Sequence, residues 1–272
     1  MRGNTHVRFG GRAGETERPK DRHRASVRPY YLKVREQGRV VSMAALVATG
    51  VARSGERRVL ALELSPGHDE GSAWPRFIRS LVERGLAGVL LVISDDHAGL
   101  VKAVREQLLG ASWQRCRVHL TRNAQDLVPR SARSMVASAI RAVFEQPDGT
   151  AARDQLDRVI DTMAGPYPRV AELLADAEAD LLAHFAFPES HRRQIRSTNP
   201  LERLNKEIKR RTAVVGIFPN RDAVIRLVGM ILAEQDDEWQ DGRRYFRPET
   251  MAALDAPPSS SEEVNPALLM AS

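Results

Sequence analysis

The sequence is poor in cysteine and has no hydrophobic run long enough to cross a bilayer. Its 272 residues include a single cysteine, Cys116, which excludes internal disulfide bonds and fits a reducing compartment. The N-terminus lacks the apolar core of a secretory signal, and no internal repeat is evident. We therefore expect a cytoplasmic protein with no membrane partner.

Positive charge is in excess. The 41 Lys and Arg residues outnumber the 35 Asp and Glu residues, which gives a net charge of +6 and a pI near 9.9. An apolar content of 42% with 28% charged residues is typical of a globular protein with a substantial core. The charge balance favours a polyanionic partner without identifying it.

Both ends of the chain have the composition of disordered segments. Residues 1–29 are rich in arginine, glycine and charge, and we expect a disordered basic leader there. This leader is either an arm that touches nucleic acid or a segment without function. Residues 253–272, which include a run of prolines and serines from Pro257, are expected to form a disordered tail.

Residues 30–130 alternate between strand and helix patterns, which predicts an α/β fold with a mixed sheet. Three β-branched runs separated by turn signals predict an antiparallel meander. The apolar run at 88–94 is typical of a central strand covered on both faces. The strands are expected at residues 31–35, 40–51, 57–64, 88–94 and 112–120.

Helices are expected between these strands and beyond them. One follows residues 66–67 with Trp74, Phe77, Ile78 and Leu81 facing inward, and another presents Leu100, Val104 and Leu108 on one side. Helical periodicity then continues through residues 131–195, which we interpret as a helical insertion. Residues 196–252 are expected to complete the core with its final helices.

Asp95, Asp96 and His97 follow the predicted central strand directly. The carboxyl end of a strand is where α/β sheets place ligands, and carboxylate oxygens suit a divalent cation. The competing interpretation is a strand-end turn in which Asp96 caps the next helix. His97 is either a neighbour of the metal ligands or the first turn of that helix.

Residues 197–211 predict a helix with one acid on a basic face. Asn199 is expected to cap it, Pro200 suits the first helical position, and Glu202 falls three residues after the cap. The cations nearby are candidate phosphate contacts: Arg203, Lys206, Lys209, Arg210 and Arg211. The alternative is a capping box followed by a solvated basic face.

Asp95 and Glu202 together are a stronger signal than either acid alone. Two carboxylates from distant segments could jointly hold Mg²⁺ for phosphoryl chemistry. Cys116 and His119 are metal-ligand types at short spacing, but zinc sites use about four ligands, and in a straight strand these two residues would face opposite ways. We therefore expect a packed cysteine rather than a zinc site there.

Taken together, these segments resemble the Mutator-type (MULE-like) transposases of bacterial insertion sequences. The motifs that carry the resemblance occur in the family's order at residues 31–36, 91–100, 113–119, 197–211 and 215–220. The resemblance covers about residues 31–251.

The resemblance implies a ribonuclease-H-like fold and an Asp-Asp-Glu triad that binds Mg²⁺ or Mn²⁺. It implies Mg²⁺-dependent DNA cleavage and strand transfer at insertion-sequence ends by a homo-oligomer at the nucleoid. By the same match, Asp95 and Glu202 are the second and third acids of the triad, and Cys116 and His119 are the family's Cys-x-x-His pair.

The first acid of the triad is missing. In the family it lies three residues before the position of Tyr31, and this sequence has Arg28 there, followed by Pro29. A guanidinium has no acceptor atom and repels Mg²⁺. The family's N-terminal helical region also has no counterpart here, so we expect an N-terminally truncated copy with impaired activity.

Two other functions stay open at this point. One is a non-catalytic, DNA-binding or oligomerising remnant of a transposase. The other is an unrelated metal-dependent nuclease or a structural DNA-binding protein.

Overall fold

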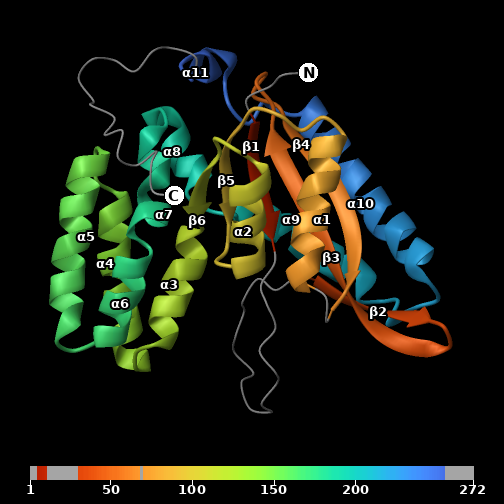
Figure 1. Cartoon of the computed structure of the whole chain (residues 1–272), viewed down its shortest axis with the longest axis horizontal. Helices are drawn as coiled ribbons and strands as arrows, with labels where there is room; N and C mark the ends of the chain where they lie inside the picture. The colour runs from red at the N-terminus through yellow and green to blue at the C-terminus, as the bar shows by residue number, and fades with distance from the viewer. Residues whose placement is uncertain (1–4, 11–29, 68–69, 255–272) are drawn as a thin grey trace.

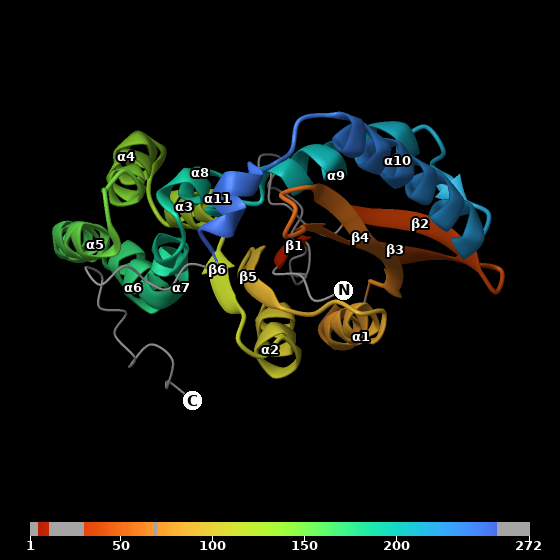
Figure 2. The same ribbon diagram turned by 90° about the horizontal axis from the view of Figure 1, so that it is seen from above.

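A mixed sheet covered by helices on both faces lies beside a separate helical region (Figures 1 and 2). The computed structural model describes residues 5–10, 30–67 and 70–254. Within these residues, no helix combines the length and the apolar character needed to cross a membrane. The expected α/β class with a mixed sheet is confirmed.

The sheet has the strand order β6-β5-β1-β3-β2-β7, with β4 paired to the long strand β3. β2, β3 and β4 form the expected antiparallel meander, while β1, β5 and β6 run parallel to one another. The strands are β1 (Thr5–Gly10), β2 (Tyr30–Glu36), β3 (Arg39–Val51), β4 (Arg57–Pro66), β5 (Val89–Ser94), β6 (Ser112–Arg115) and β7 (Ile217–Phe218).

The prediction of disorder over residues 1–29 is wrong for residues 5–10, because they form strand β1 inside the sheet. β1 pairs with β3 from His6 opposite Val51 to Gly10 opposite Val47, and β2 continues along β3 from Tyr30 opposite Ala45. The two short strands therefore lie end to end along one neighbour. The segment has the composition of a disordered segment, but its backbone pairs with β3 and β5, and this pairing makes it a strand. The remainder of the leader lies outside the described residues.

Helices cover the sheet in two layers (Figure 2). α1 and α2 lie on one face, and α9 and α10 lie on the other. The helices are α1 (Glu70–Glu83), α2 (Ala98–Gln107), α3 (Arg117–Asp126), α4 (Arg133–Phe144), α5 (Gly149–Ala164), α6 (Pro168–Asp176), α7 (Glu178–Leu182), α8 (Glu189–Ile195), α9 (Asn199–Thr212), α10 (Arg221–Asp241) and α11 (Pro248–Ala252), with 3₁₀ turns at Arg130–Ala132 and Ala183–Ala186.

Strand β3 shows why the two layers form. Its successive side chains point to opposite faces of the sheet, so both faces of this apolar strand are buried. Ala44 and Leu46 pack in the cluster that contains Trp74 of α1. Ala45 and Val47 pack in the cluster that contains α9 and α10. A residue that lies directly opposite one of these β3 residues in an antiparallel neighbour projects from the same face of the sheet.

The helical region has its own core. Buried residues of α3 to α7 form one cluster, in which Leu120 and Ala124 of α3 join Leu156 of α5. The region therefore starts with α3 rather than at residue 131. The prediction of a strand over residues 112–120 is wrong after Arg115, because α3 begins at Arg117. The predicted tail lies outside the described residues from 255 onward.

Candidate active site

The carboxyl ends of β5 and β6 meet at one edge of the sheet. Ser94 is level with Arg115 in this parallel pair, and the backbone N–H of Cys116 donates to the Ser94 carbonyl at 2.7 Å. Asp95 follows β5 directly and is only 3% exposed. The edge therefore holds a buried acid and a buried cysteine on adjacent strand ends.

Asp96 and His97 have structural partners at this edge. Asp96 forms an ion pair with Arg115 at 2.9 Å. His97 caps α2, because its Nδ1 accepts a hydrogen bond from the backbone N–H of Leu100 at 3.2 Å. The alternative in which Asp96 caps this helix is therefore wrong, because His97 is the N-cap and the first turn begins at Ala98.

Helix α9 is anchored to the same edge by Thr198. The backbone N–H and the hydroxyl of Thr198 donate to Cys116 Sγ at 3.4 and 3.2 Å. The prediction that Asn199 is the cap is wrong by one residue, because Asn199 is already helical and Thr198 precedes it. The hydroxyl of Thr198 donates its hydrogen bond to the buried sulfur of Cys116. Its oxygen does not accept the backbone N–H that a capping side chain usually accepts. This contact brings Glu202 to the edge that carries Asp95.

The two oxygens of Glu202 face different neighbours. Oε1 lies 3.4 Å from the Thr198 hydroxyl and 3.9 Å from His119 Nε2, while Oε2 lies 3.6 Å from Arg122. The Glu202 side chain is 17% exposed, and His119 is buried. Ligand atoms of Cys116, His119 and Glu202 all lie within 4.8 Å of one another. In residues 5–10, 30–67 and 70–254, this is the one such group of three or more.

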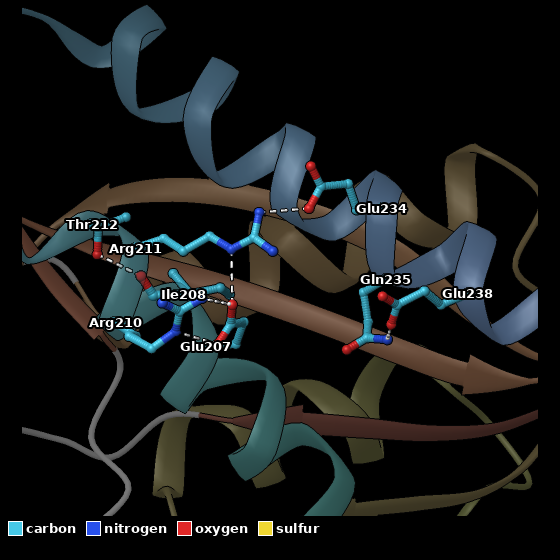
Figure 3. A network of polar contacts seen from close by, with 8 residues as sticks. All are labelled: Glu207, Ile208, Arg210, Arg211, Thr212, Glu234, Gln235 and Glu238. Carbon is cyan, nitrogen blue, oxygen red and sulfur yellow. Dashed lines mark hydrogen bonds and ion pairs between the residues drawn. The ribbon is translucent and has the colours of Figure 1, made fainter.

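Charge on α9 is partly neutralised within the helix and by α10 (Figure 3). Glu207 accepts hydrogen bonds from Arg210 and Arg211, which lower its pKa to about 2, and Arg211 also pairs with Glu234 of α10. The spacing of Glu207 from the two arginines predicts these pairs, but our reading of the sequence missed them.

The other three candidate phosphate contacts on α9 stay exposed. Arg203, Lys206 and Lys209 point outward and form no ion pair with the part of the chain that the structure describes. Of the five cations expected to contact DNA, these three are therefore available without breaking an internal pair.

A second basic cluster forms where α3, α4 and α8 meet. The backbone N–H of Arg117 donates to the Arg196 carbonyl at 3.1 Å. The Arg117 guanidinium lies over the Phe144 ring, and Arg196 donates to the Phe144 carbonyl at 2.8 Å. Burial lowers the pKa of both arginines, and the neighbouring cation Arg141 lowers that of Arg117 further. No sequence signal indicates this cluster, because its members come from distant helices.

Strands β1 and β2 meet along β3. Gly10 of β1 is opposite Val47, and Tyr30 of β2 is opposite Ala45. In the other direction, Arg8 is level with Ile93 of β5, so position 10 is level with Asp95. Residue 28 itself lies outside the described residues.

The chain is similar to known transposases over most of its length. Residues 26–242 match the family model "Transposase, Mutator family". The chain is 49% identical over 232 residues to the transposase for insertion sequence element IS1081 of Mycobacterium tuberculosis, which covers 85% of this chain and 56% of the relative.

Two further relatives show the same partial coverage. The transposase for IS406 of Burkholderia multivorans is 47% identical over 217 residues, covering 79% of this chain and 56% of the relative. The transposase for IS256 in transposon Tn4001 of Staphylococcus aureus is 38% identical over 219 residues, with 79% and 56% covered. The chain thus spans about half the length of the curated relatives it matches. On these matches, the chain belongs to the Mutator family of transposases.

Proposed function

We propose that this chain acts in DNA transposition as a ribonuclease-H-like, Asp-Asp-Glu-type transposase whose own cleavage and strand transfer are impaired. Asp95 and Glu202 are its second and third acids, and the ends of an insertion sequence are its DNA substrate. The observation that carries this proposal is the contact of Thr198 with Cys116, which seats α9 at the carboxyl edge of β5 and β6. Asp95 follows β5 at this edge, and Glu202, 107 residues later in the chain, lies beside Cys116 on the adjacent strand end.

Basic residues flank the proposed site. Arg203, Lys206 and Lys209 belong to α9, the helix that carries Glu202, and Arg117 and Arg196 follow Cys116 and precede Thr198 in the chain. Both groups suit contacts to the phosphates of DNA, which fix the position of a duplex without reading its sequence. Burial, and after it a neighbouring cation, lowers the pKa of Arg117 and of Arg196, so a bound anion would stabilise their charged forms.

The family's Mg²⁺ fits these residues only in part. Asp95 and Glu202 offer the hard oxygen ligands that Mg²⁺ prefers. Position 10, level with Asp95, is a glycine, and the nearest neighbours of Glu202 Oε1 include an imidazole. The site therefore lacks one oxygen ligand, and we expect Mg²⁺ or Mn²⁺ to be held weakly.

The alternative function is a non-catalytic transposase remnant that binds DNA or joins an oligomer. The lack of an acid at position 10 favours it for this copy. The proposed function and a DNA-binding remnant both predict DNA binding, and only the proposed function predicts residual strand transfer.

The test uses the purified full chain with two DNA probes. The first is a duplex carrying the ends of the insertion sequence that encodes this chain, and the second is a scrambled duplex of equal length. Mobility shifts across a salt series measure binding, and joining of the end duplex to plasmid measures strand transfer in Mg²⁺ or Mn²⁺.

We expect binding that weakens steeply with salt, together with strand transfer that is absent or barely detectable. Absence of binding to either duplex would contradict the proposed function and a DNA-binding remnant, and would leave only an oligomerising remnant. Efficient strand transfer by the unaltered chain would contradict the impairment.

A further inference from the structure

We propose that Cys116, His119 and Glu202 form a binding site for a transition-metal ion of the Zn²⁺ type. The site is distinct in chemistry from an all-oxygen Mg²⁺ site, and it uses Glu202 as a shared ligand. The inference does not depend on the proposed function, because it concerns metal binding by the free protein.

Helix geometry brings the first two ligands together. Cys116 is the N-cap of α3 and His119 lies three residues later, so both side chains lie on one face of the first helical turn. The expectation that they face opposite ways assumed a strand and is wrong, because α3 begins at Arg117. Both residues are buried, so their ligand atoms are held within the protein.

Helix α9 supplies the third ligand. Glu202 Oε1 lies 3.9 Å from His119 Nε2, and the three ligand atoms are within 4.8 Å of one another. Ligand atoms around a tetrahedral zinc ion lie roughly 3.3–3.8 Å apart, given bond lengths of about 2.0–2.3 Å. Closing the triangle therefore requires each pair of ligand atoms to approach by about 1.5 Å or less, which rotation of the two side chains can supply.

Charge and hydrogen bonding also suit a divalent ion. A thiolate and a carboxylate together carry two negative charges, which one divalent cation neutralises. Thr198 aims its backbone N–H and its hydroxyl at Cys116 Sγ, and these donors stabilise a thiolate that also ligates a metal. Arg122 lies against Oε2, which leaves Oε1 to face His119.

The ligand types select the metal. Sulfur and imidazole favour Zn²⁺, Co²⁺ and similar ions, whereas Mg²⁺ prefers oxygen. Three protein ligands leave a fourth position open for water or a phosphate oxygen. Because Glu202 serves this site, a bound Zn²⁺ ion would withdraw the third acid of the triad from Mg²⁺.

The test is a Co²⁺ titration of the purified full chain after chelator treatment. A thiolate bound to Co²⁺ gives a charge-transfer absorption band in the near ultraviolet. The chain has a single cysteine, so this band reports on Cys116 alone. We expect saturation at one Co²⁺ per chain and loss of the band when Zn²⁺ is added.

Variants separate a three-ligand site from binding by the thiol alone. Cys116→Ser should abolish the band, and His119→Gln and Glu202→Gln should each weaken Co²⁺ binding by at least about tenfold. Glu207→Gln makes the same chemical change on the same helix, one and a half turns away, and should leave Co²⁺ binding unchanged. Circular dichroism checks that each variant is folded.

The proposal is overturned if the unaltered chain gives no band at equimolar Co²⁺. It is equally overturned if the band and the affinity survive in His119→Gln and Glu202→Gln. If His119→Gln fails to fold, Glu202→Gln decides alone, because that side chain is partly exposed. Neither result bears on strand transfer, so failure of this inference and failure of the proposed function are distinguishable.

Discussion

At the scale of single residues, His184 illustrates a buried group held in one protonation state. It is 1% exposed and stacks on Phe144, with ring centroids 5.3 Å apart. Its Nδ1 lies 3.1 Å from Gln114 Oε1 and 3.2 Å from the Leu181 carbonyl. Both partners are acceptors, so we assign the proton of the neutral ring to Nδ1. Burial lowers the pKa of His184 from 6.5 to about 3, with a smaller contribution from Arg196.

This lowered pKa predicts that the protein loses stability in mild acid. Above pH 6.5 the histidine is neutral in both the folded and the unfolded state, and below it only the unfolded state binds a proton until pH falls to about 3. The free energy of unfolding should therefore fall by about 2 kcal/mol between pH 6.5 and pH 5 from this group. His191, whose pKa burial also lowers, adds a change of the same sign.

Urea denaturation of the unaltered chain and of His184→Gln at pH 7.5 and 5.0 measures the effect. The variant should be less stable at pH 7.5 but should show a smaller drop at pH 5.0. Equal drops in the two proteins would show that His184 does not control this pH dependence.

At the scale of elements, α9 shows which features of a helix its apolar spacing predicts and which it does not. The apolar spacing of Leu201, Leu204 and Ile208 predicts the helix and its buried face, and the structure confirms both. It does not predict which cations are paired, because that depends on rotamers and on α10. Glu207 holds Arg210 and Arg211, and Glu234 holds Arg211 from the neighbouring helix (Figure 3).

We expect Glu207→Gln to strengthen DNA binding. The substitution removes one negative charge, frees Arg210 and releases Arg211 from one of its two partners, on a face that already carries Lys206 and Lys209. Affinity for a duplex at low salt should rise several-fold, and the salt dependence should steepen by about one released counterion. Mobility shifts across a salt series measure both quantities.

Glu234→Gln is the matched control for this prediction. It removes the same charge but frees Arg211 from only one of its two partners. Its effect on DNA affinity should be smaller. Equal effects of the two substitutions would contradict a specific role of Glu207 in masking the arginines.

At the scale of the whole molecule, β1 completes the sheet between β3 and β5, and it carries no acid at the position level with Asp95. Gly10 pairs with Val47, which packs on the α9 side of the sheet. Directly opposite residues of an antiparallel pair share a face, so a side chain at position 10 would project toward the layer that holds Glu202.

If the proposed impairment holds, we expect Gly10→Asp to raise strand-transfer activity. The new carboxylate would join Asp95 and Glu202 on one face and supply the oxygen ligand that Mg²⁺ lacks. Nicking and joining of insertion-sequence ends in Mg²⁺ or Mn²⁺ should rise above the level of the unaltered chain. Arg28→Asp adds an acid at the position to which family resemblance assigns it and should give a smaller gain. Equal inactivity of both variants, in protein that still folds, would argue against the strand register as the cause of impairment.

Much of the sheet and most of the helices could be predicted from the sequence. The meander, the central strand ending at Asp95 and the inward residues of α1 follow from periodicity and turn residues, which act between near neighbours. The family motifs also identified Glu202. Two predictions failed for a common reason: β1 and the start of α3 are decided by partners far away in the chain.

The sequence alone determined the order of most elements and the acids at positions 95 and 202, and the family resemblance carries the prediction that the first acid of the triad is absent. The tertiary structure decided that residues 5–10 fill the sheet and that Cys116, His119 and Glu202 meet. Local spacing cannot encode such meetings, because they depend on strand pairing and on the seating of α9 through Thr198. The physical reason is that side-chain periodicity is a property of one element, whereas a site is built where several elements end.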